Sequence, residues 1–142
     1  MTKDEFVLAC LSPANGEPYG SVQLQKALFL VDTTIPDATG GPHFRFVPGD
    51  YGPRGPGVFA TVHDLTKRGH IITNSRGWST SYQLSVRGQL VGEDALMLLP
   101  AGAQAYICEV SAFVRRLGFT QLLSAIYTAY PEMAVNAVFR HG

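Results

Sequence analysis

The sequence has little charge, little cysteine and no long apolar run. Only 15% of its 142 residues are charged, and 11 bases balance 11 acids, so neither sign is in excess overall. The longest apolar stretches, such as 27–31 and 95–101, are far shorter than the roughly 18 residues that a membrane-spanning helix requires. Residues 1–5 carry acids where a secretory signal has bases followed by an apolar segment. We therefore expect no membrane segment and a cytoplasmic location.

Cysteine and histidine are too sparse to indicate a disulfide framework or a metal centre. Cys10 and Cys108 lie 98 positions apart in apolar stretches, and we interpret both as buried free thiols. The histidines are scattered singly along the chain, at His43, His63, His70 and His141. The sequence therefore predicts no metal site and no cofactor.

What the chain does contain is enough apolar material for one core. With 46% apolar residues, 142 residues can bury roughly two thirds of the unfolded surface, and no composition shift marks a linker. We therefore predict a single domain, 1–142. Helical periodicity, caps and breakers indicate helices at about 3–11, 21–32, 57–67, 86–99, 103–117, 120–130 and 131–139.

Three strands are predicted, at 44–47, 70–73 and 81–85, with the last two joined as a hairpin by residues 74–80. Segment 33–43 is interpreted as a surface loop, and segment 48–57, in which most residues are Gly or Pro, as a shaped backbone connector. The predicted core side chains of the helices near 21–32 and 57–67 are Val22, Leu24, Leu28, Val31, Phe59, Val62 and Leu65.

The order of these elements suggests a mostly helical α+β fold with a winged-helix-like core. Residues 3–88 would form that core, as helix, helix, strand, helix and hairpin, and residues 89–142 would add C-terminal helices. About twenty residues separate Asp32 from Pro53, whereas a simple helix-turn-helix uses three or four. This spacing argues against groove reading by the third helix.

Several short motifs carry a family resemblance. They are Val22–Leu30, Tyr51–Phe59, Leu65–Ile71, Tyr82–Gly88 and Ile126–Glu132. In this order and spacing the chain resembles the Panacea group of phage-associated, SocA-like proteins and the related YwgA-like bacterial proteins. The resemblance implies a small non-enzymatic module that binds a protein partner, as an antitoxin, an adaptor or a phage-associated regulator. Winged-helix relatives also include DNA-binding repressors.

A local charge asymmetry selects candidate binding residues. Between Arg54 and Arg87 there are five bases and one acid, which fits either a solvated basic face or a footprint for an anionic partner. We predict a partner-binding surface made of Tyr51, Arg54, Arg76 and Trp78. Two structural alternatives stay open at this point: Tyr51 could merely fix the entry of the next helix, and Trp78 could fold back onto the core.

The alternative function is a DNA-binding transcriptional regulator. Such a regulator would contact DNA phosphates with its basic side chains, and it could form a dimer through the apolar C-terminal helices. The candidate nucleic-acid contacts are Arg54, Lys67, Arg68, Ser75 and Arg76. The zero net charge favours the protein partner over DNA.

Catalysis is not expected, because none of the common nucleophile, phosphate-loop or metal motifs is present. The catalytic alternative that remains is an acid–base pair of Asp50 with His43 or His63.

Overall fold

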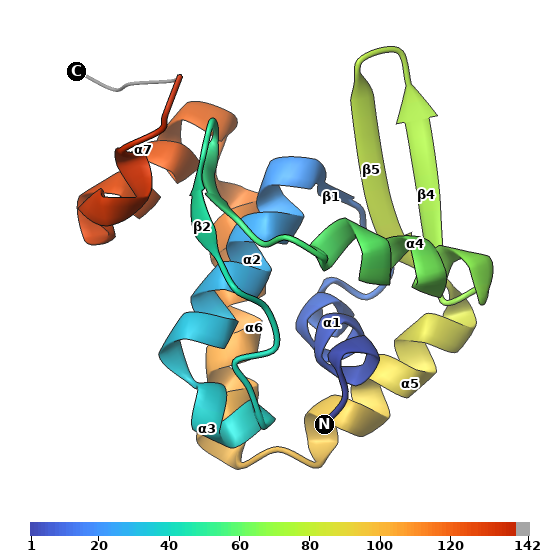
Figure 1. Cartoon of the computed structure of the whole chain (residues 1–142). Coiled ribbons are helices and arrows are strands. Elements are labelled where there is room, and N and C mark those ends of the chain that lie inside the picture. Colours follow the sequence, from blue (N-terminus) through green and yellow to red (C-terminus); the bar gives the residue numbers. More distant parts are fainter. Residues whose placement is uncertain (139–142) are drawn as a thin grey trace.

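The computed structural model describes residues 1–138 and shows a mostly helical α+β fold (Figure 1). Its helices are α1 (Lys3–Leu11), α2 (Ser21–Thr34), α3 (Pro36–Thr39), α4 (Val58–Lys67), α5 (Val86–Met97), α6 (Ala101–Arg116) and α7 (Phe119–Ala129), with 3-10 turns η1 (Ser12–Ala14) and η2 (Pro131–Ala134). Its strands are β1 (Tyr19–Gly20), β2 (Val47–Gly49), β3 (Gly52–Arg54), β4 (Ile71–Arg76) and β5 (Ser79–Leu84).

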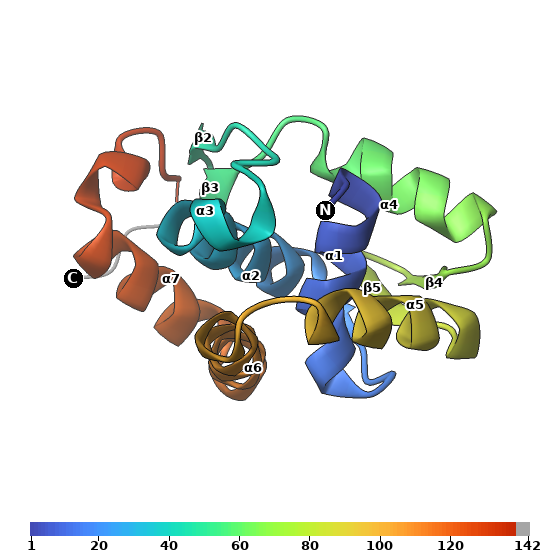
Figure 2. The same ribbon diagram turned by 90° about the horizontal axis from the view of Figure 1, so that it is seen from below.

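Helix α1 lies at the centre of the molecule, packed among α2, α4, α5 and α6 (Figure 2). It begins with a capping box, in which Thr2 and Glu5 each accept a hydrogen bond from the other's backbone N–H. Every residue from Phe6 to Leu11 is buried, so this helix has no solvent-facing side over that length. A helix that is apolar all round needs partners on every side, and the surrounding helices supply them.

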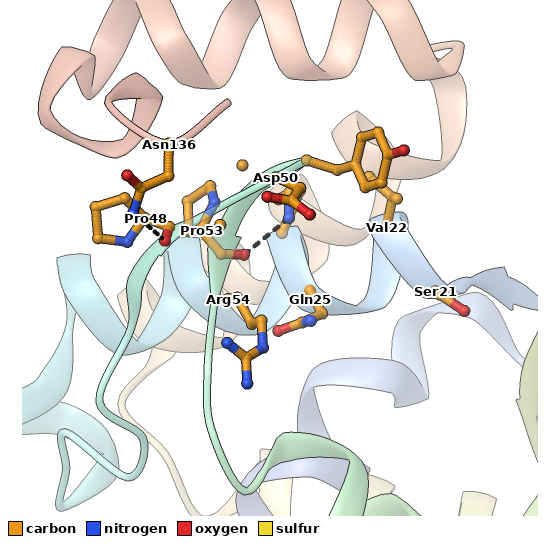
Figure 3. A pocket seen from close by; sticks show the side chains of 12 residues that line it. Ser21, Val22, Gln25, Pro48, Asp50, Pro53, Arg54 and Asn136 are labelled. Carbon is orange, nitrogen blue, oxygen red and sulfur yellow. Dashed lines mark hydrogen bonds between the residues drawn. The ribbon is translucent and has the colours of Figure 1, made fainter. Parts of the chain in front are cut away.

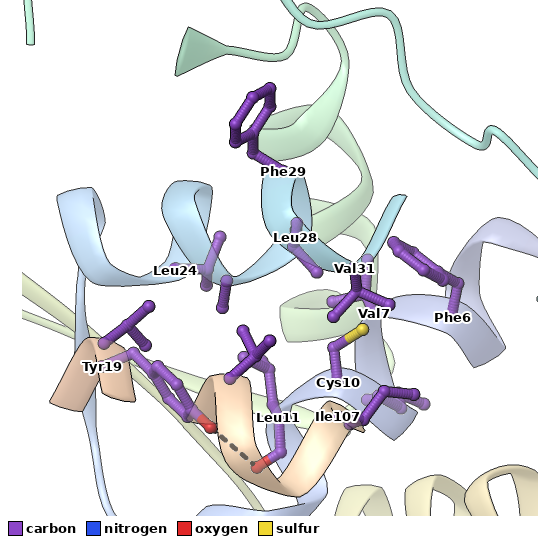
Figure 4. Close-up of a cluster of buried hydrophobic side chains, with 14 of the residues drawn as sticks. Phe6, Val7, Cys10, Leu11, Tyr19, Leu24, Leu28, Phe29, Val31 and Ile107 are labelled. Carbon is purple, nitrogen blue, oxygen red and sulfur yellow. Dashed lines mark hydrogen bonds between the residues drawn. The ribbon is translucent and has the colours of Figure 1, made fainter. Parts of the chain in front are cut away.

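The main hydrophobic cluster joins the first half of the chain to the second. Leu24 and Leu28 of α2 meet Leu11 of α1 and Ile107 of α6 in one continuous core (Figure 4). The predicted core residues of α2 and α4 all belong to it, with Val22 and Phe59 only partly buried. Glycine allows α5 to lie directly against α1, because a Cβ at Gly92 would collide with the Leu8 carbonyl.

The predicted hairpin is present, but its strands are longer and its turn is shorter than expected. β4 and β5 are paired from Ile71↔Leu84 to Arg76↔Ser79, so Gly77 and Trp78 alone form the turn. Gly77 has φ +59°, the left-handed conformation that such tight turns require. β5 also pairs with β1, so β4 is an edge of this three-stranded sheet, and the hairpin projects away from the helices (Figure 1).

The prediction of a strand at 44–47 was wrong. The rings of Phe44 and Phe46 pack against each other, with centroids 6.3 Å apart, and the strand begins at Val47 instead. It pairs with β3, so the stretch interpreted as a connector contains a second, smaller hairpin. Pro48 and Pro53 face each other in this ribbon, which is possible because a two-stranded ribbon has free edges where a missing N–H is tolerated.

Other boundaries also differ from the predictions. Segment 33–43 holds the end of α2 and all of α3, and it is therefore not a plain loop. The last predicted helix is the short turn η2, and its expected end near Phe139 lies outside the described residues, as does His141. Cys10 is buried as predicted, whereas Cys108 is exposed, because it sits on the outer face of α6. Within residues 1–138, no helix is both long and apolar enough to cross a membrane.

Candidate functional site

A large hollow lies between the start of α2 and the β2–β3 hairpin, and we call it the lysine hollow (Figure 3). It has a volume of about 760 Å³. Gln25 and Lys26 line it from α2, and Asp50, Tyr51 and Arg54 line it from the hairpin. Polar and apolar groups therefore meet in one space, as is common in ligand sites.

Lys26 is the unexpected member of this hollow. The sequence pattern places it on the polar side of α2, yet its side chain is only 2% exposed. Its Nζ donates a hydrogen bond to the Pro53 carbonyl oxygen at 2.8 Å. Because burial disfavours the charged ammonium, the pKa of Lys26 falls from its ordinary value of 10.5 to about 7. Lys26 can therefore change charge near neutral pH.

Two further contacts hold the hairpin over α2. The Gln25 Oε1 accepts a hydrogen bond from the Gly55 backbone N–H at 2.9 Å. Gly52 has φ +87°, and a Cβ there would lie 2.7 Å from Lys26 Cε and 3.1 Å from Leu123 Cδ2. Only glycine fits both this conformation and this space. The Tyr51-Gly52-Pro53 motif thus shapes the hollow.

The other side of the hairpin is held by the end of the described chain. Asn136 Nδ2 donates to the Pro48 carbonyl at 3.3 Å, and the Val138 N–H donates to the Asp50 carbonyl at 3.1 Å. Asn136 also lines the lysine hollow. The hollow is therefore built from residues near both ends of the sequence.

A second hollow, of about 490 Å³, lies beside the tip of the β4–β5 hairpin, and we call it the hairpin hollow. Trp78 and Phe119 line the hairpin hollow. Ser21 and Val22 line both the lysine hollow and the hairpin hollow. The Tyr51 and Phe119 rings meet edge to face, with centroids 5.9 Å apart. These two rings connect the two hollows into one extended surface.

The predicted partner-binding residues are divided between these hollows. Tyr51 and Arg54 line the lysine hollow, and Trp78 lines the hairpin hollow. The Trp78 side chain has an exposed fraction of 106%, so it does not fold back onto the core. Arg76 is exposed at the end of β4, and it lines neither hollow.

The candidate nucleic-acid contacts do not all remain available. Arg68 is engaged by Asp4, with Nη1 and Oδ2 2.8 Å apart. Ser75 Oγ lies 3.3 Å from Thr80 Oγ1 across the hairpin. Lys67 is exposed in the last turn of α4, where a cation interacts favourably with the helix dipole.

Asp32, near the end of α2, is the second buried charged side chain of this helix. Its Oδ1 and Oδ2 accept hydrogen bonds from the His43 N–H at 2.8 and 3.0 Å, and Oδ2 also accepts from the Phe44 N–H at 2.8 Å. The His43 ring stacks on Phe6, with centroids 4.7 Å apart, and its Nε2 lies 2.8 Å from the Thr39 carbonyl. His43 is thus held by packing and hydrogen bonds at this end of the helix, which gives no support to a pair with Asp50.

Comparisons of the chain with family models, curated proteins and solved structures found no match. Function is therefore inferred from the residues of these two hollows.

Two of these residues, Lys26 and Phe119, were not among the predicted site residues. Lys26 follows two glutamines on the polar side of its helix and looks like an ordinary surface residue. Phe119 follows Gly118 at the start of α7, and its exposure of 45% depends on how α7 is placed against the hairpins. Neither has a local sequence signal that could have identified it.

Proposed function

We propose that this chain is a non-enzymatic protein-binding module that uses the hairpin hollow to bind a partner, as an antitoxin, adaptor or phage-associated regulator does. The observation that carries the proposal is the complete exposure of Trp78 at the tip of a projecting hairpin. A large ring in that position makes no contribution to the core. Tryptophan is also among the residues most enriched at the energetic centres of protein interfaces.

The surroundings of Trp78 support a protein partner. Phe119 is 45% exposed and Tyr51 is 51% exposed, and their rings continue the aromatic surface away from Trp78. Such a surface, with a hollow beside it, suits an apolar anchor side chain that enters from a partner protein. Exposed aromatic groups that gather in this way are more informative than single exposed apolar residues, which are common on every protein surface.

We further propose that the architecture is winged-helix-like and related to the Panacea and YwgA-like proteins. Helices α1, α2 and α4 would be its three helices, and the β4–β5 hairpin would be its wing. The order of these elements along the chain supports this assignment. The insertion of α3, β2 and β3 between α2 and α4 explains the unusually long spacing between the second and third helices of the proposed core.

DNA binding has less support than protein binding. The exposed side of α4 presents Ala60, His63, Asp64 and Lys67, so one acid offsets one base on the helix that would enter a groove. Arg68 is engaged by Asp4. A protein that binds DNA relies on several unpaired cations close to the phosphates. The exposed side of α4 presents only Lys67 as such a cation.

The test is partner capture with the Trp78→Ala variant. Purified tagged protein is incubated with a lysate of its native host, and bound proteins are quantified by mass spectrometry. We expect a partner that wild-type protein retains and that Trp78→Ala loses at least tenfold. Because Trp78 is exposed, the free energy of unfolding should change by less than about 0.5 kcal/mol, as measured by urea denaturation.

The matched control is Leu98→Ala, which removes a large apolar side chain of 85% exposure at the end of α5, outside both hollows. This variant should retain the partner. Equal losses in both variants would contradict the proposal. Salt-sensitive binding to random duplex DNA that disappears with Arg76→Ala would favour the regulator instead.

A further inference from the structure

Lys26 has hydrogen-bond donors that neither the fold nor the proposed partner surface uses. A protonated lysine carries three N–H donors, and the described contacts of Lys26 Nζ consist of one bond, to the Pro53 carbonyl. Its side chain lines a hollow of about 760 Å³. A buried cation with unused donors beside such a space is a typical place for an anion to bind.

The charged side chains that line the hollow together with Lys26 cancel each other. Asp50 and Arg54 line the same hollow from the hairpin, and Tyr51 is the other titratable side chain there. Helix α7 packs against both α2 and β3. It has no charged residue, and Tyr127 is the one titratable residue in this helix. With Lys26 neutral, the charges of Arg54 and Asp50 therefore sum to zero.

We propose that the lysine hollow binds a small monocarboxylate with an apolar body, held through its carboxylate by Lys26 and Arg54, and that one proton enters with the ligand. Gln25 can supply further donors, because its Oε1 is used by Gly55 while its amide N–H groups face no described acceptor. The apolar body would lie against Val22 and the ring of Tyr51. This site goes beyond the proposed partner binding and does not require Trp78.

The charge balance favours a monoanion. A carboxylate with protonated Lys26 leaves the site as neutral as it is when empty, because one positive and one negative charge enter together. A doubly charged phosphate ester would leave one negative charge uncompensated beside the buried amine of Lys26. We therefore assign a carboxylate rather than a phosphate to this hollow.

Proton uptake follows from the titration of Lys26. In the free protein the amine is half protonated near pH 7, because burial lowers its pKa to about 7. A bound carboxylate stabilises the ammonium and raises this pKa again. Above pH 7 the affinity should consequently fall by up to about tenfold for each pH unit, with one proton taken up for each ligand bound.

The experiment uses N-acetyl-L-phenylalanine and benzoate as probes, with N-acetyl-L-phenylalaninamide and benzamide as neutral counterparts of the same shape. Binding to the whole chain is followed by ¹H–¹⁵N NMR titration at pH 6.5 and 8.5. Calorimetry in two buffers of different ionisation enthalpy then counts the protons. We expect both acids to bind at least tenfold more tightly than their amides, and more tightly at pH 6.5. Preference for the N-acetyl amino acid over benzoate would identify the end of a peptide chain as the source of the carboxylate.

Variants locate the site. Lys26→Met should abolish the pH dependence and weaken acid binding at least tenfold, whereas Arg87→Gln, which removes an exposed base on α5, should leave both unchanged. Two results would overturn the proposal. One is equal binding of the acids and their amides, and the other is no binding of either acid at a probe concentration of roughly 10 mM, which corresponds to very weak affinity. If Lys26→Met does not fold, the acid–amide and pH comparisons on the wild-type protein still decide it.

Discussion

Two buried charges on the same helix have opposite surroundings. Lys26 and Asp32 lie six positions apart on α2, and each is only 2% exposed. The two carboxylate oxygens of Asp32 accept hydrogen bonds from the backbone N–H groups of His43 and Phe44. Lys26 has one described hydrogen bond and a hollow in front of it. Burial of a charged side chain alone therefore does not point to a ligand site, whereas a buried amine with unused donors beside a hollow is a candidate for one.

The largest effect should come from removing the satisfied charge. We expect Asp32→Ala to lower the free energy of unfolding by about 3 kcal/mol or more, because two backbone N–H groups would be left buried without an acceptor. Urea denaturation at pH 7 measures the loss. Asp32→Asn keeps one acceptor oxygen and should lose less. A loss below 1 kcal/mol for the alanine variant would mean that water readily replaces this carboxylate.

The second prediction concerns the pH dependence that Lys26 confers on stability. The folded state lowers the pKa of this amine to about 7, so the unfolded chain binds the proton more tightly than the folded one. Stability must therefore rise with pH, from about pH 7 toward the ordinary pKa of lysine. Between pH 7 and pH 9 the contribution of Lys26 to the free energy of unfolding should grow by about 2 kcal/mol.

Lys26→Met isolates this contribution, since the thioether side chain fills similar space without a charge. The wild-type protein should gain about 2 kcal/mol relative to this variant between pH 7 and pH 9, in urea denaturations at each pH. Comparing the two proteins cancels the titration of other groups, such as the Cys10 thiol, whose pKa burial raises. Parallel pH profiles would show that the amine stays protonated in the folded protein.

A smaller effect should separate two glycines that share a conformation. Gly52 and Gly57 both have a positive φ, of +87° and +92°, but a Cβ meets Lys26 and Leu123 only at Gly52. Each alanine variant should lose about 1 kcal/mol from backbone strain. Gly52→Ala should lose about 1 kcal/mol more, because its methyl group displaces the Lys26 side chain. Thermal or urea unfolding of the two variants gives the difference directly, and equal losses would mean that the hairpin shifts freely over α2.

The sequence was most informative where the determinants are local. The capping box at Thr2 and the apolar spacing of α4 placed their helices closely, and the polar residues around Gly77 predicted a hairpin. These features depend on neighbours within a few positions, and a pattern in the sequence records them.

The site depends instead on contacts between distant segments. Lys26 is buried because a hairpin some 27 positions later covers it, through the bond to Pro53. No spacing rule predicts that two prolines lie opposite each other in a two-stranded ribbon. The pairing of β2 with β3 was therefore not predicted, and this segment was interpreted as a connector. Tyr51 and Arg54 were selected for their residue types, and both line the lysine hollow, but that choice did not indicate the buried amine of Lys26 beside them.

The attachment of Pro48 and Asp50 to Asn136 and Val138 has a consequence for the order in which the molecule is made. The bond from Asn136 spans 88 positions of the chain. Since synthesis proceeds from the N-terminus, α1 to α6 can assemble on one another before these last partners emerge. The lysine hollow would then mature later than the α1–α6 core, and a ligand or partner would meet it only after Asn136 and Val138 have been synthesised.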